Sequence, residues 1–282
     1  MIKRVYGYLM LHKGPVPEAT RTLHERGFVA IRGALDAQTV AELRTDVERV
    51  FDEDPADQRL STRDAEGTAS FRYAMLNRSA AAQQALANPR ILEVIDPLLG
   101  DDCHVIANTA WRNAAGKPGS HGGDNWHIDA GPHVPRASGV KWPAEIPYPT
   151  FAIASHILLR DLELADGPTG FIPGSQRSGR IPPFDALKDP ELSWEGEQCV
   201  PVLGAAGDVV LFISDIWHRR MPTLAADAGR LFLQVHYARR DIAQRLYETS
   251  ESNQLSAEAI ARAQTPRERT LVGLHDPMFY DG

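Results

Sequence analysis

Residues Gly207-Asp208-Val209-Val210-Leu211-Phe212-Ile213 form the stretch that most clearly predicts the fold. A run of β-branched and aromatic residues directly after a Gly-Asp turn signal is typical of a buried strand. Similar short runs, separated by Gly and Pro, recur at 103–111, 150–162, 169–172, 199–203 and 231–237. Many short strands divided by turns predict a jelly roll or a sandwich. The irregular stretch 178–197 is long enough to be a loop over a site.

The first hundred residues have the spacing of helices. Pro17 to Arg26 is predicted to be a short helix that ends at Gly27, ahead of a strand at 28–32. Asp36 fits an N-cap, and apolar residues three and four positions apart predict an amphipathic helix after it. Further helices are expected at 79–87, 90–99, 241–248 and 256–264.

These patterns predict a single domain over residues 1–282. We expect a helix-rich part at about 1–100, a β core at about 101–240 and a helical tail at 241–282. The chain contains no internal repeat and no low-complexity linker. The expected fold is mainly β with flanking helices.

Composition excludes several classes of protein. The 282 residues are 43% hydrophobic and 24% charged, as in an ordinary globular protein. The net charge of −7 argues against nucleic acid as a partner, because such binding needs a basic face. No apolar run is long enough for a membrane span. Two cysteines are too few for a disulfide framework, so we expect a cytoplasmic protein, and the oligomeric state stays open.

The segment Trp126-His127-Ile128-Asp129 carries the strongest candidate for chemistry. Residues two apart on a strand point to the same face, so His127 and Asp129 can bind one metal ion together. His218, after the 209–213 strand, is the candidate third ligand. Two imidazoles and one carboxylate that leave positions open are the ligand set of non-haem Fe(II) oxygenases. For each residue the alternative is structural: a surface His-Asp pair and a partly buried histidine.

Two other constellations are weaker. His121, His127 and His133 are spaced six apart, which fits neither a helix face nor a zinc finger. Ser175 lies in Pro-Gly-Ser-Gln and lacks the second glycine of a hydrolase nucleophile turn. Neither a phosphate loop nor a dinucleotide fingerprint is present.

Four short motifs in the expected order resemble the phytanoyl-CoA dioxygenase family of Fe(II)- and 2-oxoglutarate-dependent oxygenases. They are the His127–Asp129 pair, the turn from Gly167-Pro168 to Pro173-Gly174-Ser175, Gly207-Asp208 with its strand and His218, and then Arg230. The run from Leu23 to Leu35 is similar to the opening of the family. Gln176 stands where the family pattern has a histidine, but that histidine is not a metal ligand. The resemblance covers roughly residues 20 to 240.

The resemblance implies a double-stranded β-helix, a cupin-like jelly-roll barrel, with the N-terminal helices packed outside. It implies Fe(II) bound by His127, Asp129 and His218, with 2-oxoglutarate and O2 as co-substrates. Arg230 matches the family position that binds the distal carboxylate of 2-oxoglutarate. A guanidinium suits this role because it is always charged and binds carboxylate through two N–H groups.

Three further residues are weaker candidates for binding the co-substrate. Thr169 follows the Gly167-Pro168 turn, and Thr109 shares a strand face with Ala107 and Trp111. His156 falls near a position that faces the co-substrate in relatives, and a buried structural histidine explains it equally well. Strand alternation places Arg230 on the face that, taken alone, would be read as exposed to solvent. Only the resemblance turns that face toward a polar cavity.

The reaction implied by the family is oxidative decarboxylation of 2-oxoglutarate to succinate and CO2, coupled to oxidation of a substrate C–H bond. Related halogenases have a small residue in place of the carboxylate ligand, so Asp129 favours hydroxylation or a hydroxylation-like outcome. The expected substrate is a small molecule of specialised metabolism, and the variable loops decide which one. Two alternatives remain open. One is a barrel that binds small molecules without catalysis, and the other is a cupin-type metal enzyme that does not use 2-oxoglutarate.

Overall fold

The centre of the fold is a six-stranded antiparallel sheet in the order β1-β7-β4-β9-β3-β2. The structure is a computed structural model, which describes residues 15–53, 70–113, 115, 125–224, 228–242 and 255–275. The six strands are β1 (Phe28–Ile31), β2 (Ser70–Tyr73), β3 (His104–Asn113), β4 (Ala152–Leu158), β7 (Val209–Ile213) and β9 (Arg230–Ala238).

Alternating side chains give this sheet two different faces. Odd-numbered residues of β9, such as Leu231 and Val235, belong to the large apolar core together with the helices. Val209, Leu211 and Ile213 of β7 do the same, whereas Val210 and Phe212 form a second core cluster with Phe171 of β5. Successive residues of a strand point to opposite faces, so even-numbered residues of β4, β7 and β9 face the smaller sheet.

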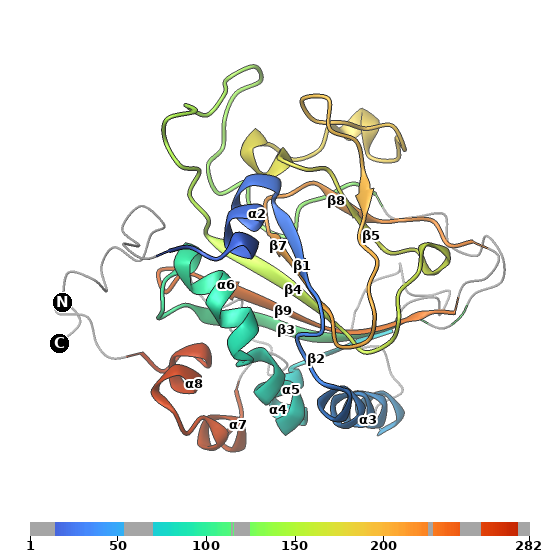
Figure 1. Cartoon of the computed structure of the whole chain (residues 1–282), viewed down its shortest axis with the longest axis vertical. Helices are drawn as coiled ribbons and strands as arrows, with labels where there is room; N and C mark the ends of the chain where they lie inside the picture. Colours follow the sequence, from blue (N-terminus) through green and yellow to red (C-terminus); the bar gives the residue numbers. More distant parts are fainter. Residues whose placement is uncertain are drawn as a thin grey trace.

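The smaller sheet is three-stranded, in the order β6-β5-β8. It consists of β5 (Thr169–Phe171), β6 (Val200–Pro201) and β8 (His218–Arg220). Figure 1 shows β5 and β8 on one side of the large sheet, and α3 to α8 along its other side. The expected mainly β, jelly-roll-like fold with flanking helices is confirmed. However, the two sheets do not close into one barrel over the described residues, because the segments between them are irregular and rich in Gly and Pro.

The helices begin and end close to where capping residues predict. They are α2 (Glu18–Arg26), α3 (Ala37–Glu53), α4 (Met75–Arg78), α5 (Ala80–Leu86), α6 (Pro89–Leu99), α7 (Ala257–Arg262) and α8 (Pro266–Leu271). Gly27 ends α2 at φ +86°, a conformation that glycine adopts without strain. Asp36 Oδ1 accepts the Thr39 N–H at 2.7 Å, and Ser79 caps α5 through the Ala82 N–H. The tail helix expected at 256–264 is present as α7, whereas most of the one expected at 241–248 lies outside the described residues.

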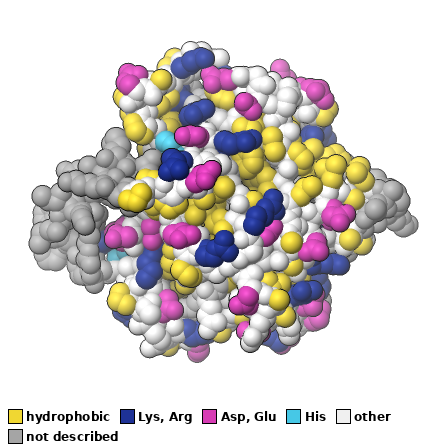
Figure 2. Space-filling view, in the orientation of Figure 1, with side chains coloured by type: hydrophobic (Ala, Val, Ile, Leu, Met, Phe, Trp, Pro, Cys, Tyr) yellow, Lys and Arg dark blue, Asp and Glu magenta, His cyan; other side chains and the backbone are white. Residues whose placement is uncertain are grey.

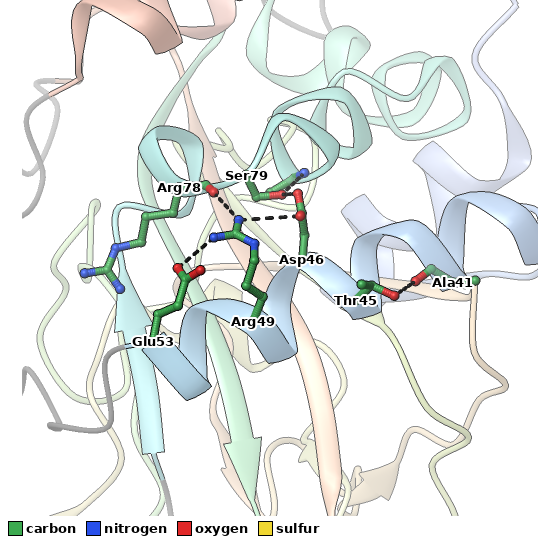
Figure 3. A network of polar contacts seen from close by, with 8 residues as sticks. Ala41, Thr45, Asp46, Arg49, Glu53, Arg78 and Ser79 are labelled. Atoms are coloured by element: carbon green, nitrogen blue, oxygen red, sulfur yellow. Dashed lines mark hydrogen bonds and ion pairs between the residues drawn. The ribbon is translucent and has the colours of Figure 1, made fainter.

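Polar contacts join α3 to the neighbouring short helices (Figure 3). Arg49 of α3 donates to the Arg78 carbonyl at 2.9 Å and pairs with Glu53 at 2.8 Å. Asp46 accepts the Ser79 hydroxyl at 2.7 Å. The buried stripe of α3, with Leu43 and Val47, packs into the large core. These contacts hold the helical layer against the sheet, away from the metal-ligand candidates.

Two strands were not expected from the sequence. β2 pairs with β3 at the edge of the large sheet, and β8 pairs with β5. β8 is three residues long and contains two arginines, so it lacks the apolar pattern of a strand. Its strand conformation comes from pairing with β5, which places His218 opposite Phe171.

The molecular surface in Figure 2 intersperses basic and acidic side chains with hydrophobic ones, and no single-sign patch dominates this face. Within the described parts of the chain, every helix is too short or too polar to cross a membrane.

Candidate active site

His127 and His218 lie opposite each other in an isolated antiparallel bridge. The His127 N–H donates to the His218 carbonyl, and the His218 N–H donates to the His127 carbonyl, both at 3.0 Å. Two residues that exchange both hydrogen bonds project their side chains to the same face. The two imidazole centroids are therefore only 4.3 Å apart. The strand assumed for His127 and Asp129 in the sequence is present only as this bridge.

Both imidazoles are held in the same tautomer by local backbone. His127 Nδ1 lies 2.7 Å from the Asn125 carbonyl, and His218 Nδ1 lies 2.9 Å from the Ile216 carbonyl. A carbonyl only accepts, so each Nδ1 is the protonated donor. Nε2 of each neutral ring is then left with its lone pair. Metal-binding histidines are oriented in this way, through a hydrogen bond made by the other ring nitrogen.

Asp129 completes the group, and its position depends on the loop between β7 and β8. Its N–H donates to the Ser214 carbonyl at 3.1 Å. Its Oδ1 lies 3.4 Å from His218 Nε2 and 3.9 Å from His127 Nε2. One ligand atom from each of the three residues falls within 4.8 Å of the others. These are two imidazole nitrogens and one carboxylate oxygen around a common point, a donor set that fits a divalent transition metal.

The electrostatics of the group favour an ionised Asp129. Burial alone raises the pKa of a carboxyl group, but the imidazoles of His218, His236 and His127 together hold the pKa of Asp129 well below its usual range. Burial likewise lowers the pKa of His218, yet the Asp129 carboxylate outweighs it and raises that pKa. Metal binding at His218 therefore competes with a proton for Nε2.

The 178–197 segment lies beside the group, as expected for a loop near a site. The Trp126 N–H donates to the Leu187 carbonyl at 2.8 Å, and its indole Nε1 donates to the Asp189 carbonyl at 2.7 Å. The Trp126 side chain is buried with Trp217 and Ile172. The loop thus fixes the residue directly before His127. The side chain of His127 remains 46% exposed, whereas that of His218 is 6% exposed.

The even-numbered face of β9 points into the interior and not to solvent. Strand alternation taken alone would suggest a solvent-exposed face, whereas the resemblance implied an interior one, and the interior position is the one observed. Arg230 is 7% exposed and His236 is 6% exposed. The smaller sheet and the loops cover this face, and the sequence of β9 alone does not indicate that it is covered. The Arg230 guanidinium donates from Nε to Asn113 Oδ1 and from Nη1 to the Gly167 carbonyl, each at 3.0 Å.

The other three co-substrate candidates lie around this interior. His156 of β4 pairs in register with Gln234 of β9, and Thr109 of β3 pairs with the same residue from the other side. Thr109 Oγ1 is 3.2 Å from the Trp111 indole nitrogen, which also donates to Gln234 at 2.7 Å. The side chain of Thr109 therefore already takes part in a polar contact.

Thr169 of β5 is 8% exposed and pairs in register with Arg220 of β8. Arg220 and Arg230 both approach Gly167. A Cβ on that glycine would lie 3.3 Å from Arg220 Nε, and its carbonyl accepts from Arg230. Arg220 is a cation of this region that the sequence did not single out. The sequence feature that could have indicated Arg220 is its position two residues after His218, on the same strand face.

His156 pairs in register with Gln234, which stands between Arg230 and His236 on the interior face of β9. Its ring is in contact with the rings of Phe212 and Phe232, with centroids 5.0 Å and 4.5 Å away. Burial lowers the pKa of His156 to about 3, and the positive charge of Arg230 adds to this, while Asp129 opposes it. The influence of both Asp129 and Arg230 indicates that they share one interior. His156 is therefore neutral at physiological pH.

This depressed pKa predicts an acid-sensitive fold. A histidine whose folded pKa lies below its unfolded value binds fewer protons when folded, so it costs stability as the pH falls from 6.5 toward 3. The cost is at most about 1.4 kcal/mol per pH unit in that window. We expect His156→Phe, which suits the two flanking phenylalanine rings, to weaken this loss. Urea unfolding at several pH values measures it. Ser155→Ala, a buried neighbour without a charge, should keep the wild-type slope, and equal slopes for wild type and His156→Phe would contradict the prediction.

His236, like Arg220, belongs to this site and was not singled out from the sequence. Its Nε2 lies 3.7 Å from Asp129 Oδ2. It shares the interior face of β9 with Arg230, because both are even-numbered residues of the same strand. This shared face is the sequence feature that could have indicated His236.

The family is decided by a comparison with family models. The model described as phytanoyl-CoA dioxygenase (PhyH) matches residues 23–224. The chain belongs to the phytanoyl-CoA dioxygenase family. The matched region includes the His127–Asp129 pair and His218, and it ends before Arg230. The resemblance inferred from four short motifs is therefore confirmed, and so is the expectation of a dioxygenase-type enzyme.

Solved structures similar to this phytanoyl-CoA dioxygenase family member share its fold at low identity. SnoK, a non-haem α-ketoglutarate-dependent carbocyclase from nogalamycin biosynthesis, has a TM-score of 0.62 and 19% identity, over 88% of this chain and 96% of that chain. The epimerase SnoN, in complex with Fe3+, α-ketoglutarate and nogalamycin RO, has a TM-score of 0.60 and 17% identity, over 86% of this chain and 95% of that chain. HygX from Streptomyces hygroscopicus, with nickel and 2-oxoglutarate bound, has the same TM-score of 0.60 and 17% identity, over 86% of this chain and 95% of that chain.

Proposed function

We propose that this chain is an Fe(II)- and 2-oxoglutarate-dependent oxygenase acting on a small organic molecule, in which His127, Asp129 and His218 bind the metal. The observation that carries the proposal is the convergence of two imidazole Nε2 atoms and one carboxylate oxygen within 4.8 Å. The tautomer of both rings supports it, because each Nδ1–H is bound to a backbone carbonyl. A chance cluster of two histidines and an aspartate would not require both rings to turn the same nitrogen inward.

The position of Arg230 supports a dianionic co-substrate. Its guanidinium is buried on the interior face of β9, and its bonds to Asn113 and Gly167 fix its orientation. A buried cation in a poorly solvated space favours a carboxylate partner. In this proposal Arg230 binds the distal carboxylate of 2-oxoglutarate. Neutral His156 lines the path between Arg230 and the metal ligands, and Thr169 and Thr109 are weaker candidates for contacts to the co-substrate.

When bound, the metal supplies activation of O2 coupled to conversion of 2-oxoglutarate into succinate and CO2. The residues of the chain orient the reactants and keep bulk water from the reacting atoms. Phe212, Phe232 and Phe171 provide apolar walls close to His156 and His218. The exposed side of His127 marks where a substrate approaches. We infer that these groups belong to a single catalytic domain.

The outcome at the substrate is proposed as oxidation of a C–H bond, with hydroxylation favoured. Relatives of this fold are described as a carbocyclase and an epimerase, so the fold alone does not select one outcome. Asp129 fills the ligand position that halogenases keep small, which argues against halogenation. Both of these relatives come from nogalamycin biosynthesis, which supports a small metabolite of specialised metabolism as the substrate.

An anaerobic titration tests this proposal without knowledge of the substrate. Fe(II) and then 2-oxoglutarate are added to the metal-free protein, and a visible charge-transfer band is expected when the keto acid chelates the metal. Succinate formation after admission of air is the second readout. A catalytically inert binding protein would give no band. Oxygen uptake that is independent of 2-oxoglutarate would instead favour a cupin-type enzyme, and either result would overturn the proposal.

A further inference from the structure

The two oxygens of the Asp129 carboxylate face different partners. Oδ1 is directed at the metal-ligand candidates, 3.4 Å from His218 Nε2 and 3.9 Å from His127 Nε2. Oδ2 instead faces a third imidazole, with His236 Nε2 at 3.7 Å. One carboxylate is thus shared between a metal position and a histidine outside the ligand set.

The register of the large sheet determines which residues surround His236. Its partner on β3 is Ala107, and its partner on β4 is Ala154. Two alanines, one on each neighbouring strand, leave the volume that an imidazole and the Asp129 side chain need between them. His236 is 6% exposed, so its ring is held by packing. The position is therefore fixed by the sheet, whereas Asp129 arrives from an irregular segment.

We propose that His236 is a positioning residue that holds Oδ2 of Asp129, so that the carboxylate binds the metal through Oδ1 alone. This inference rests on the metal site proposed above. The atoms are in ion-pair range, and a shift of roughly half an ångström brings them to hydrogen-bond distance. The Nε2–H of His236 then donates to Oδ2. Hydrogen bonds from residues outside the ligand set orient metal ligands and tune the affinity of the site for the metal.

Binding through one oxygen matters for the number of open positions. His127, His218 and one oxygen of Asp129 would supply three ligands to a bound metal ion. The remaining positions would then be left for the keto-acid end of 2-oxoglutarate and for O2. A carboxylate that chelated through both oxygens would occupy a position that a co-substrate requires. His236 prevents this by engaging the second oxygen.

Three imidazoles lie close to the Asp129 carboxylate: those of His127 and His218 near Oδ1, and that of His236 near Oδ2. The charged and titratable groups around the carboxylate are the three histidines and, further along the interior, His156 and Arg230.

The experiment measures Co(II) binding to the whole protein by anaerobic calorimetry, together with the visible spectrum of the bound ion. His236→Leu removes the donor, and we expect a dissociation constant about 10- to 100-fold weaker than wild type. His236→Gln places an amide N–H close to the original Nε2, and its affinity should stay close to wild type. His236→Asn is too short to reach Oδ2 and should resemble the leucine variant. The visible spectrum should change in the Leu and Asn variants and be kept in Gln.

His24→Gln is the matched control, because it removes an imidazole that bonds the Tyr148 carbonyl and lies outside the site. Its Co(II) affinity should equal that of wild type. Equal affinities in the Gln and Asn variants, or a Leu variant that binds like wild type, would overturn the role of His236. If His236→Leu does not fold, the comparison between Gln and Asn decides. If the wild-type protein binds no Co(II), the proposed metal site itself is wrong. This result is distinct from one that contradicts only the role of His236.

Discussion

Asp129→Ala is expected to abolish succinate formation. It should also weaken metal binding by more than roughly 100-fold, the upper range for removal of a residue that only hydrogen-bonds to a metal ligand. The carboxylate supplies the only negative charge among the three ligand candidates and lies within 3.9 Å of both imidazole Nε2 atoms. Without it, two neutral imidazoles must hold the ion, and the keto acid loses the geometry that aligns it. Anaerobic Fe(II) titration and succinate release measure the two effects.

Asp189→Ala is the control for this variant. Asp189 contacts Trp126 through its main-chain carbonyl, which the alanine retains, so the site should keep its metal affinity. A cooperative thermal transition in both proteins shows that each is folded. Wild-type turnover in Asp129→Ala would defeat the assignment of the triad.

Arg230→Leu is expected to raise the concentration of 2-oxoglutarate needed for half-maximal turnover by about 30-fold or more. This corresponds to the 2 kcal/mol or more that removal of one partner from a buried, hydrogen-bonded charge pair costs. Metal affinity in the absence of 2-oxoglutarate should change little, because Arg230 lies at the other end of β9 from His236. Titration of the charge-transfer band with 2-oxoglutarate measures the affinity directly.

Two further variants sharpen this result. Arg230→Lys keeps the charge but loses the two-pronged geometry, so its affinity for 2-oxoglutarate should fall between those of wild type and the leucine variant. Arg160→Leu, an exposed arginine after β4, should match wild type. If Arg230→Leu binds 2-oxoglutarate as wild type does, another cation holds the distal carboxylate, and Arg220, which also approaches Gly167, becomes the residue to test.

Local patterns predicted most of the elements. The helix that ends at Gly27, the helix capped by Asp36 and the strand at 209–213 depend on nearest-neighbour chemistry, so they formed where the sequence placed them. β8 escaped prediction because its Arg-Arg sequence has no apolar periodicity, and only pairing with β5 makes it a strand. A strand that depends on a partner leaves little record in its own residues.

The candidate site shows the same division. The spacing of His127 and Asp129, with His218 and Arg230 in family order, was sufficient to name those four residues. The sequence could not supply the carbonyls that fix each Nδ1, nor the Leu187 and Asp189 carbonyls that hold Trp126. Those partners are backbone groups, which every residue has, so no side-chain pattern marks them.

The sequence by itself determined most of the elements, the family and the identity of the metal-ligand candidates, because these depend on side-chain chemistry in short motifs. Alternation along β9 also determined that Arg230 and His236 share a face. The resemblance turned this face toward a cavity, but only the tertiary structure decided what covers it, since the smaller sheet and the loops come from distant parts of the chain. It likewise brought His236 to Oδ2 of Asp129, because the two residues meet through sheet register and a loop rather than through any sequence interval.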